Sequence, residues 1–286
     1  MTHDAGTTWR EMLSETTAML GSEREARFLC EHAAGLDATD FNLAQNETVT
    51  QRMGLHVHEM ARRRLAGEPL QYVMGRWAFR RLDLLVDSRV LIPRSETELV
   101  AEIALSYAQR VSPTRVIVDL GTGSGAIGLS LADELPERGT SVWLTDDSQD
   151  ALHVARANVA AIGRRGANAR IVQGSWYAAL PESLRGSVDV IVSNPPYIAD
   201  GDPDVEDIVT RYEPHQALFA GVDGLSSLRI IVDGAREWLR PGGVLVCEIG
   251  HRQGSTVSEL CDRAGLTQVE VRRDLTGRDR VVVARA

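Results

Sequence analysis

The chain has 286 residues, of which 43% are hydrophobic and 25% are charged, with a formal net charge of −9. This length and composition fit one large or two modest globular domains, each with a real core. The acidic balance gives no overall basic surface for nucleic acid. Because the sequence contains no Lys, a Schiff-base lysine and a P-loop lysine are both excluded.

Cysteine usage and hydropathy bear on the cellular location. The three cysteines, Cys30, Cys247 and Cys261, are odd in number and unclustered. Such cysteines suit a reducing cytosol and indicate neither a disulfide framework nor a metal site. No apolar run approaches the ~20 residues of a membrane span, and Met1 to Arg10 is polar and lacks the apolar core of a signal peptide. We therefore expect a cytoplasmic protein with no metal ion and no membrane partner.

Residues 1–75 have the periodicity of a small helical domain. Apolar residues recur at helical spacing over Trp9–Leu20, Glu23–Gly35 and Thr50–Ala66, and Asp40–Leu43 is predicted to be a short connection. This domain contains 7 Arg against 11 Asp plus Glu. Its mild acidity favours contact with a protein over contact with a nucleic acid, so we expect it to recognise a protein substrate.

Residues 76–92 are predicted to form a hairpin that links two domains. Two short extended runs, Phe79–Leu85 and Ser88–Ile92, lie on either side of Asp87-Ser88. Ser95 follows, and it is expected to cap a helix that runs through Tyr107, with Glu98 as the partner in a capping box.

Residues 93–286 alternate strand and helix patterns. Strands are predicted at Arg115–Leu120, Ser141–Thr145, Ala169–Val172, Val188–Val192, Val244–Ile249, Thr267–Val271 and Arg280–Ala284. Helices are predicted at Ala126–Leu135, Ala151–Ala161, Leu225–Leu239 and Ser255–Ala264. The alternation predicts an α/β fold with a doubly wound, mostly parallel sheet. The last two strands are close enough in sequence to pair antiparallel.

The first strand of this region is followed by a ligand-binding pattern. The loop Gly121-Thr122-Gly123-Ser124-Gly125 lies between a strand that ends in an acidic residue and a helix, where glycine lets the backbone approach a ligand closely. The next strand ends at Asp146, 25 residues after Gly121, where a carboxylate can hold a ribose diol. The alternative for Asp146 is an N-cap of the following helix. Trp176, after the third strand, is either a flank for a flat heterocycle or a core residue.

The fourth strand ends in Asn194-Pro195-Pro196-Tyr197. Two consecutive prolines stop both strand and helix, so a rigid tetrapeptide lies at the carboxyl end of a strand, where open α/β sheets bind ligands. The Asn194 amide, the carbonyl of Pro195 and the ring of Tyr197 can hold and cover a planar amide or amine. The alternative is a strand-terminating turn with a packed Tyr. An acidic stretch, residues 199–207, follows as a solvated loop or a lid.

These motifs together resemble the class I S-adenosylmethionine-dependent methyltransferases, which have a seven-stranded Rossmann-like sheet. The chain is similar over nearly its whole length to the release-factor glutamine N5-methyltransferases, the HemK/PrmC family. The resemblance rests on Asp119-Leu120-Gly121-Thr122-Gly123-Ser124-Gly125, Asp146, Asn194-Pro195-Pro196-Tyr197, and four further segments: 67–75, 91–98, 211–214 and 248–254.

The resemblance implies a fold, a cofactor and a set of roles. The implied cofactor is S-adenosylmethionine, with Gly121, Thr122, Gly123, Ser124 and Gly125 on its methionine part, Asp146 on its ribose, Trp176 beside its adenine, and Asn194 next to it. Asn194, Pro195, Pro196 and Tyr197 would hold the substrate glutamine, and Asn194, Pro195 and Tyr197 would act in catalysis. The implied partner is a peptide chain release factor, methylated at the glutamine of its Gly-Gly-Gln motif by a monomeric enzyme.

Two positions depart from the family pattern. Ser95 stands where the family commonly has Pro, and Ser175 stands where it often has Asp before the Trp. The second departure replaces a charged contact to the adenine amino group with a hydroxyl that can donate or accept one hydrogen bond.

Three rival functions remain compatible with the sequence. One is a glutamine methyltransferase that acts on a ribosomal protein. Another is a nucleic-acid amino-group methyltransferase, which the acidic balance and the missing basic recognition domain disfavour. The third is a cofactor-binding module that only docks a partner.

Overall fold

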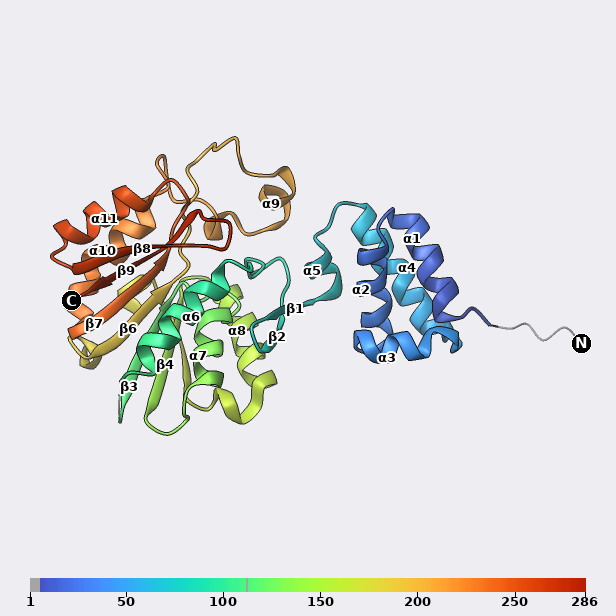
Figure 1. Ribbon diagram of the computed structural model, residues 1–286, viewed down its shortest axis with the longest axis horizontal. Helices are drawn as coiled ribbons and strands as arrows, with labels where there is room; N and C mark the ends of the chain where they lie inside the picture. Colours follow the sequence, from blue (N-terminus) through green and yellow to red (C-terminus); the bar gives the residue numbers. More distant parts are fainter. Residues whose placement is uncertain (1–5, 112) are drawn as a thin grey trace, which may run out of the picture. The chain divides into compact units, whose positions relative to one another are not determined.

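The computed structural model describes residues 6–111 and 113–286, which form two compact units divided between Gly75 and Arg76. Each unit has its own helices or sheet (Figure 1) and is described by itself. Met1 to Ala5, part of the stretch predicted to lack a signal peptide, lie outside the described residues. Within the described ranges, no helix is long and apolar enough to cross a membrane.

The first unit is helical, as predicted. Its elements are α1 (Trp9–Leu20), α2 (Glu23–Ala34), α3 (Ala38–Leu43), the short 3-10 turn η1 (Ala44–Asn46), α4 (Gln51–Leu65) and α5 (Leu70–Met74). Thr8 and Glu11 form a capping box at the start of α1, and Gly21 ends that helix in the left-handed conformation. The core includes Trp9 and Phe41, whose rings meet edge to face with centroids 5.6 Å apart.

One segment of this unit differs from the prediction. The stretch at residues 40–43 was expected to be a connection and instead belongs to α3. The reason is Asp37, whose carboxylate accepts hydrogen bonds from the backbone N–H groups of Thr39 and Asp40, both at 2.8 Å. This N-cap satisfies the free N–H groups at the start of the helix and so stabilises a helix of only six residues.

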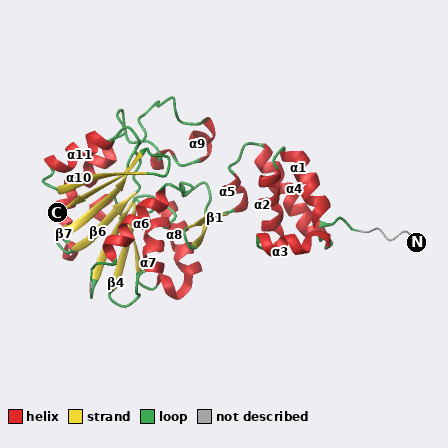
Figure 2. Cartoon of the chain, in the orientation of Figure 1, coloured by secondary structure: helices red, strands yellow, loops and turns green. Residues whose placement is uncertain are grey.

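The second unit is built on a seven-stranded sheet flanked by helices (Figure 2). Its strands are β3 (Arg115–Leu120), β4 (Thr140–Asp146), β5 (Ala169–Gln173), β6 (Val188–Ser193), β7 (Leu239–Glu248), β8 (Thr267–Arg273) and β9 (Asp279–Arg285). The order is β5-β4-β3-β6-β7-β9-β8. Strands β3 to β7 run parallel, and β9 pairs antiparallel with β8, as predicted, and also with β7.

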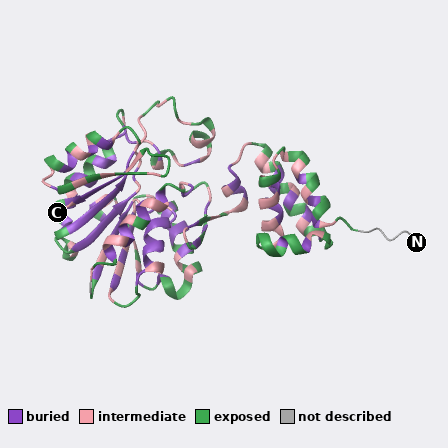
Figure 3. Cartoon of the chain, in the orientation of Figure 1, coloured by how far each residue is buried: buried purple, intermediate pink, exposed green. Residues whose placement is uncertain are grey.

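Helices cover this sheet and bury its centre. They are α6 (Thr97–Ala108), α7 (Ala126–Glu134), α8 (Gln149–Ile162), α9 (Asp207–Tyr212), α10 (Ser226–Trp238) and α11 (Gly254–Arg263), with short 3-10 turns η2 (Gly163–Gly166), η3 (Trp176–Ala179), η4 (Glu182–Leu184) and η5 (His215–Ala217). Every residue of β6 is buried, and the buried colour follows the middle of the sheet (Figure 3). Strands buried on both faces read as continuous apolar runs, which is why the central strands could be predicted.

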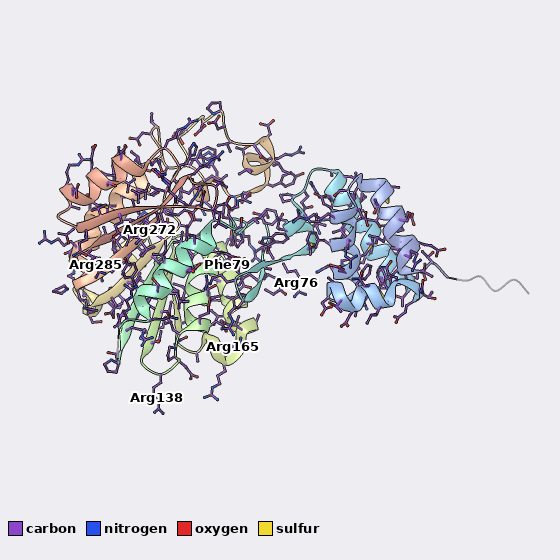
Figure 4. The ribbon with its side chains drawn as sticks, viewed as in Figure 1. Arg76, Phe79, Arg138, Arg165, Arg272 and Arg285 are labelled. Carbon is purple, nitrogen blue, oxygen red and sulfur yellow. The ribbon has the colours of Figure 1, made fainter. Side chains whose placement is uncertain are left out.

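A two-stranded hairpin precedes this sheet, but not where the sequence predicted it. Strands β1 (Arg76–Phe79) and β2 (Leu82–Leu85) turn at residues 80–81, and Arg80 has a φ of 50°. Phe79 is buried in the second unit, whereas Arg76 at the other end of the strand is exposed (Figure 4). Contacts distant in sequence hold the turn: the backbone N–H of Arg80 donates to Glu98 at 2.9 Å, and its guanidinium pairs with Glu134 at 2.6 Å.

The same contacts explain why the predicted capping box at Ser95 is wrong. Helix α6 begins at Thr97 without a side-chain cap. The hydroxyl of Ser95 donates to Glu96 at 3.0 Å, and the Glu98 carboxylate is engaged by Arg80. Residues 88–89 form a turn and residues 90–92 are irregular, so no strand forms there; the Asp87 carboxylate stabilises the turn by accepting the backbone N–H of Arg89 at 3.0 Å.

Candidate active site

The carboxyl ends of four parallel strands meet at one edge of the sheet. Leu120 at the end of β3 pairs with Thr145 of β4, and Ser193 at the end of β6 pairs with Cys247 of β7. This register places the glycine loop, Asp146, Asn194 and the last residue of β7 around one point, as the topology of an open α/β sheet requires.

A cavity of about 240 Å³ lies at this edge. Its lining comprises Arg89, Val90, Leu91, Pro93, Thr97, Gly121, Thr122, Gly123, Ser124, Ala126, Ile127, Asp146, Asp147, Ser148, Ala151, Gly174, Ser175, Trp176, Asn194, Pro196, Pro214, Gln216, Ala217, Phe219 and Ser227. Gly125, Pro195 and Tyr197 are predicted site residues that do not line it. All of these residues belong to the second unit.

The glycine loop takes its shape from Asp119. This carboxylate is buried at the end of β3 and accepts hydrogen bonds from the Thr122 hydroxyl at 2.6 Å and the Gly128 N–H at 2.8 Å. Burial raises the pKa of Asp119 to about 6, although both hydrogen bonds work against the rise. Asp119 therefore ties the loop to the first turn of α7.

Glycine is required in this loop by conformation and by space. Gly121 and Gly125 have φ of 69° and 89°, in the left-handed region. A Cβ on Gly121 would lie 3.4 Å from the ring of Trp176, and one on Gly125 would lie 2.8 Å from Leu129. A side chain at Gly125 would press on the helix behind the loop, and one at Gly121 would touch the aromatic ring that lines the cavity.

Asp146 faces the cavity and also holds the loop. Its Oδ2 accepts the Gly123 N–H at 2.9 Å, and its Oδ1 accepts the Ser148 N–H at 2.9 Å. Burial is the main cause that raises its pKa. Ser148 is the residue that caps α8, through a hydrogen bond from Ala151, so Asp146 is not the N-cap that the alternative interpretation required.

Trp176 and Ser175 line the cavity next to the loop. Trp176 is the first residue of η3 and has a φ of 48°, an uncommon conformation for a bulky residue. It also packs partly against the main core cluster of the sheet. The indole therefore combines the two roles that the sequence left open, a wall of the cavity and a part of the core.

The structure divides the Asn-Pro-Pro-Tyr segment between two environments. Asn194 and Pro196 line the cavity, whereas Pro195 is buried. The Tyr197 hydroxyl donates to Glu248 Oε1 at 3.2 Å, and burial raises the Tyr197 pKa well above its usual value. Tyr197 thus turns toward the end of β7.

Two buried groups that the sequence analysis did not single out support Asn194. Its Nδ2 donates to the Thr97 hydroxyl at 3.1 Å, and that hydroxyl donates to Glu248 Oε2 at 2.7 Å. Thr97 and Glu248 are 3% and 1% exposed. Glu248 had a signal in the sequence, an acidic residue near the end of an apolar strand, whereas Thr97 had none; both were used only as parts of family segments.

Gln253 fixes the backbone of the same segment. Its Nε2 donates to the carbonyl of Tyr197 at 3.0 Å and to that of Gly224 at 3.1 Å, while its Oε1 accepts the Gly250 N–H at 2.9 Å. A single side-chain amide therefore joins three loops at the carboxyl edge of the sheet.

Two other segments, 91–94 and 211–214, are joined by an ion pair. The buried carboxylate of Glu213 pairs with Arg94 and accepts the Ile92 N–H at 3.1 Å. This contact carries Leu91 and Pro214 to the cavity wall. Residues 199–207, the acidic stretch weighed as a lid, are absent from the cavity lining.

The described part of the chain contains no candidate metal-binding site. Across residues 6–111 and 113–286, no group of three or more His, Cys, Asp or Glu side chains has the geometry to hold a metal ion. Cys30, Cys247 and Cys261 are free and buried, and burial raises the pKa of each thiol.

Comparison with known proteins identifies the two units separately. Residues 8–75 match the family model described as "PrmC N-terminal domain", and residues 98–212 match "Methyltransferase small domain". A methyltransferase from Pyrococcus furiosus aligns over 78% of this chain and 96% of its own, with a TM-score of 0.52 and 18% identity, which shows the fold alone.

Relatives at higher identity span both units. The chain is 46% identical over 226 residues, 79% of each protein, to a "Release factor glutamine methyltransferase" of Xylella fastidiosa. It is 39% identical over 282 residues to the protein of the same name from Deinococcus radiodurans, which covers 96% of this chain and 98% of the relative. The fold, the site and these relatives agree, and the chain belongs to the release factor glutamine methyltransferase family.

Proposed function

We propose that this chain transfers a methyl group from S-adenosylmethionine to the side-chain amide nitrogen (N5) of a glutamine in a peptide chain release factor, within its Gly-Gly-Gln motif. The relatives named for this activity support the reaction. The structural observation that carries the proposal is the Asn194 amide, which lines the same cavity as the glycine loop and Asp146. An amide-binding group therefore lies beside a nucleoside-binding pattern.

The residues present fit the cofactor. Gly121 and Gly123 line the cavity, and without side chains their backbone is open to a ligand. Each oxygen of Asp146 accepts one backbone N–H and keeps a further lone pair, so both ribose hydroxyls can donate to this carboxylate. Trp176 supplies a flat apolar face for adenine, with Ser175 beside it as a single donor or acceptor.

The substrate amide needs help to react. An amide nitrogen is a weak nucleophile because its lone pair is delocalised into the carbonyl. Asn194 Nδ2 is engaged by Thr97, so its Oδ1 is the atom that can accept a hydrogen bond from the substrate NH2 group. A second acceptor, the Pro195 carbonyl, would complete the clamp, and Tyr197 would limit the pocket. When both N–H groups of the substrate amide donate to these acceptors, electron density shifts onto the amide nitrogen and its orientation is fixed.

The reaction balances without a strong base. Bound S-adenosylmethionine supplies a methyl group on a positively charged sulfur, which departs as a neutral thioether with the S–C electron pair. The amide nitrogen forms the new N–C bond and releases one proton to solvent. The chain's own contribution is to position the substrate amide, to orient it by hydrogen bonds and to exclude water. We expect these effects to account for most of the rate acceleration.

The first unit is proposed to recognise the release factor. It is acidic in composition, with helices and its own core, and it matches the family model described as "PrmC N-terminal domain". We propose that the enzyme acts as a monomer in the cytoplasm and does not bind nucleic acid directly. Salt-sensitive binding to RNA would contradict that last point.

The proposal is tested by Asn194→Ala. We expect methyl transfer to a purified release factor to fall by at least ~100-fold, because the loss of a positioned hydrogen-bond acceptor costs about 3 kcal/mol of transition-state stabilisation. The dissociation constant of S-adenosylmethionine, measured by calorimetry, should change less than about 3-fold. Turnover at the parental rate would show that Asn194 does not hold the substrate.

A further inference from the structure

A chain of hydrogen bonds runs behind the cavity wall and ends at Asn194. It starts at the buried carboxylate of Glu248, passes through the Thr97 hydroxyl at 2.7 Å and reaches Asn194 Nδ2 at 3.1 Å. The other carboxylate oxygen of Glu248, Oε1, accepts a hydrogen bond from the Tyr197 hydroxyl at 3.2 Å. Glu248 therefore contacts both polar side chains of the Asn-Pro-Pro-Tyr segment, directly or through one residue.

The fold places these groups with little freedom. Ser193 pairs with Cys247, so Asn194 and Glu248 leave neighbouring parallel strands at the same level. Thr97 is the first residue of α6, a helix that packs on both β6 and β7. The carboxylate does not line the cavity, whereas Thr97 and Asn194 do.

The direction of the hydrogen bonds follows from the charge on Glu248. An ionised carboxylate only accepts, so the Thr97 hydroxyl must donate to it, and the Thr97 oxygen then accepts from Asn194. This order turns the NH2 group of Asn194 toward Thr97 and leaves Oδ1 for the substrate. A protonated Glu248 can donate to Thr97 instead, which frees the hydroxyl to donate to Oδ1 and turns the NH2 group toward the substrate.

We propose that Glu248 is a positioning residue that, acting through Thr97, sets which atom of the Asn194 amide faces the substrate glutamine. This inference rests on the proposed function, because it assigns the acceptor that the substrate amide needs. The wrong orientation would place two NH2 groups against each other, with both sides donating. Glu248 itself touches neither substrate nor cofactor.

The surroundings of Glu248 make its charge responsive to pH. Burial raises its pKa to about 7. The hydrogen bonds from Thr97 and Tyr197 and the charge of Arg280 on β9 act in the opposite direction, while the charge of Glu96 adds to the rise. Arg280 is itself shared, since its guanidinium also pairs with Asp274 at 3.3 Å. Methyl transfer should therefore decline as pH falls through about 7.

The test compares Glu248→Gln with the parent enzyme. We expect kcat for a release factor to fall at least ~10-fold at pH 8, while the dissociation constant of S-adenosylmethionine stays within ~3-fold, and the decline below pH 7 disappears. Thr97→Val should lower kcat by a similar factor, and Thr97→Ser should have a kcat close to that of the parent because it keeps the hydroxyl. The double variant Glu248→Gln/Thr97→Val should be no worse than Thr97→Val by more than ~3-fold, since both act on one path.

The matched control is Glu270→Gln, the same chemical change at an exposed position of β8, which should keep the parental rate and pH profile. A readout without turnover comes from the side-chain 1H–15N resonances of Asn194 in the cofactor-free protein. In the parent they should titrate with an inflection near pH 7, and in Glu248→Gln they should not.

The outcomes separate the two claims. If the parent methylates a release factor and Glu248→Gln does so at the parental rate with an unchanged pH profile, the positioning role is overturned and the proposed function stands. If the parent methylates no release factor, the proposed function fails, and the Asn194 titration still decides the orientation. An Asn194 signal that titrates identically in the parent and in Glu248→Gln overturns the role of Glu248.

Discussion

Asn158 offers the sharpest test of how the second unit is held together. This side chain is 1% exposed on α8 and joins strand β2 to the glycine loop. Its Oδ1 accepts the Leu85 N–H at 2.7 Å, and its Nδ2 donates to the carbonyls of Leu85 at 3.1 Å and Ser124 at 2.9 Å. Asn158→Leu keeps the number and branching of the side-chain heavy atoms and removes all three hydrogen bonds.

The expected cost follows from the groups left behind. Each backbone group that loses its partner away from water costs about 1 to 3 kcal/mol. Leu85 is 40% exposed, so its two backbone groups belong near the lower value, whereas the Ser124 carbonyl is at a buried position and belongs near the upper one. The free energy of unfolding of the second unit should fall by about 3 to 5 kcal/mol.

The measurement must report on this unit separately. Native-state hydrogen exchange of amides in β3 and β4 gives the local unfolding free energy there. Arg156→Leu is the control, because it introduces the same side chain at an exposed position of the same helix, and it should change the value by less than ~0.5 kcal/mol. A loss below about 1 kcal/mol in Asn158→Leu would refute the reasoning.

Three further outcomes follow from the site. Gly121→Ala should weaken cofactor binding at least ~10-fold because a Cβ at a φ of 69° strains the loop that lines the cavity, whereas Gly201→Ala, at a similar φ of 76° but outside the cavity lining, should leave the affinity measured by calorimetry unchanged. Asp146→Asn should weaken cofactor binding by a similar factor, since the amide offers a single acceptor oxygen to four donors: two backbone N–H groups and two ribose hydroxyls. Unchanged affinity would show that the ribose is held elsewhere. Glu248 has a raised pKa in the folded state and binds its proton more tightly there. The free energy of unfolding should therefore fall by up to ~3 kcal/mol as the pH rises from about 4.5 to 7. Glu248→Gln should flatten that slope in urea titrations, and an equal slope in both proteins would contradict the assignment.

Local sequence patterns were enough to predict most of the second unit. The buried parallel strands appear as apolar runs, and the loop at residues 121–125 follows one of them directly. Both signals depend on neighbours in sequence, and both are confirmed. The antiparallel pairing of β8 and β9 was predicted because only a few residues separate them.

The errors arose where distant contacts decide local structure. The hairpin turn lies at Arg80 because Glu98 and Glu134, far along the chain, hold that residue in a positive-φ conformation. The start of α6 is displaced for the same reason, since the expected capping partner Glu98 is used by Arg80. Pairings over such separations leave no trace in a window of a few residues.

The site shows the same division. The glycine loop, Asp146 and Asn194 could be found from their positions at strand ends, and the structure brings them to one cavity. Thr97 and Glu248 could not, because a helix start 97 residues before Asn194 and a strand end 51 residues after Tyr197 converge only in the fold. Tyr197 stays a predicted wall of the substrate pocket, and the contact of its hydroxyl with Glu248 is a further feature that local sequence did not indicate.

The central claim is that the cavity directs a methyl group to one glutamine nitrogen of a release factor. The most direct measurement is incubation of the enzyme with labelled S-adenosylmethionine and a purified release factor, followed by mass spectrometric location of the label. The account predicts a single methyl group on the side-chain nitrogen of the Gly-Gly-Gln glutamine, and no label when that glutamine is replaced. Label that persists on the replaced protein, or label found instead on a ribosomal protein or a nucleic acid, would contradict it.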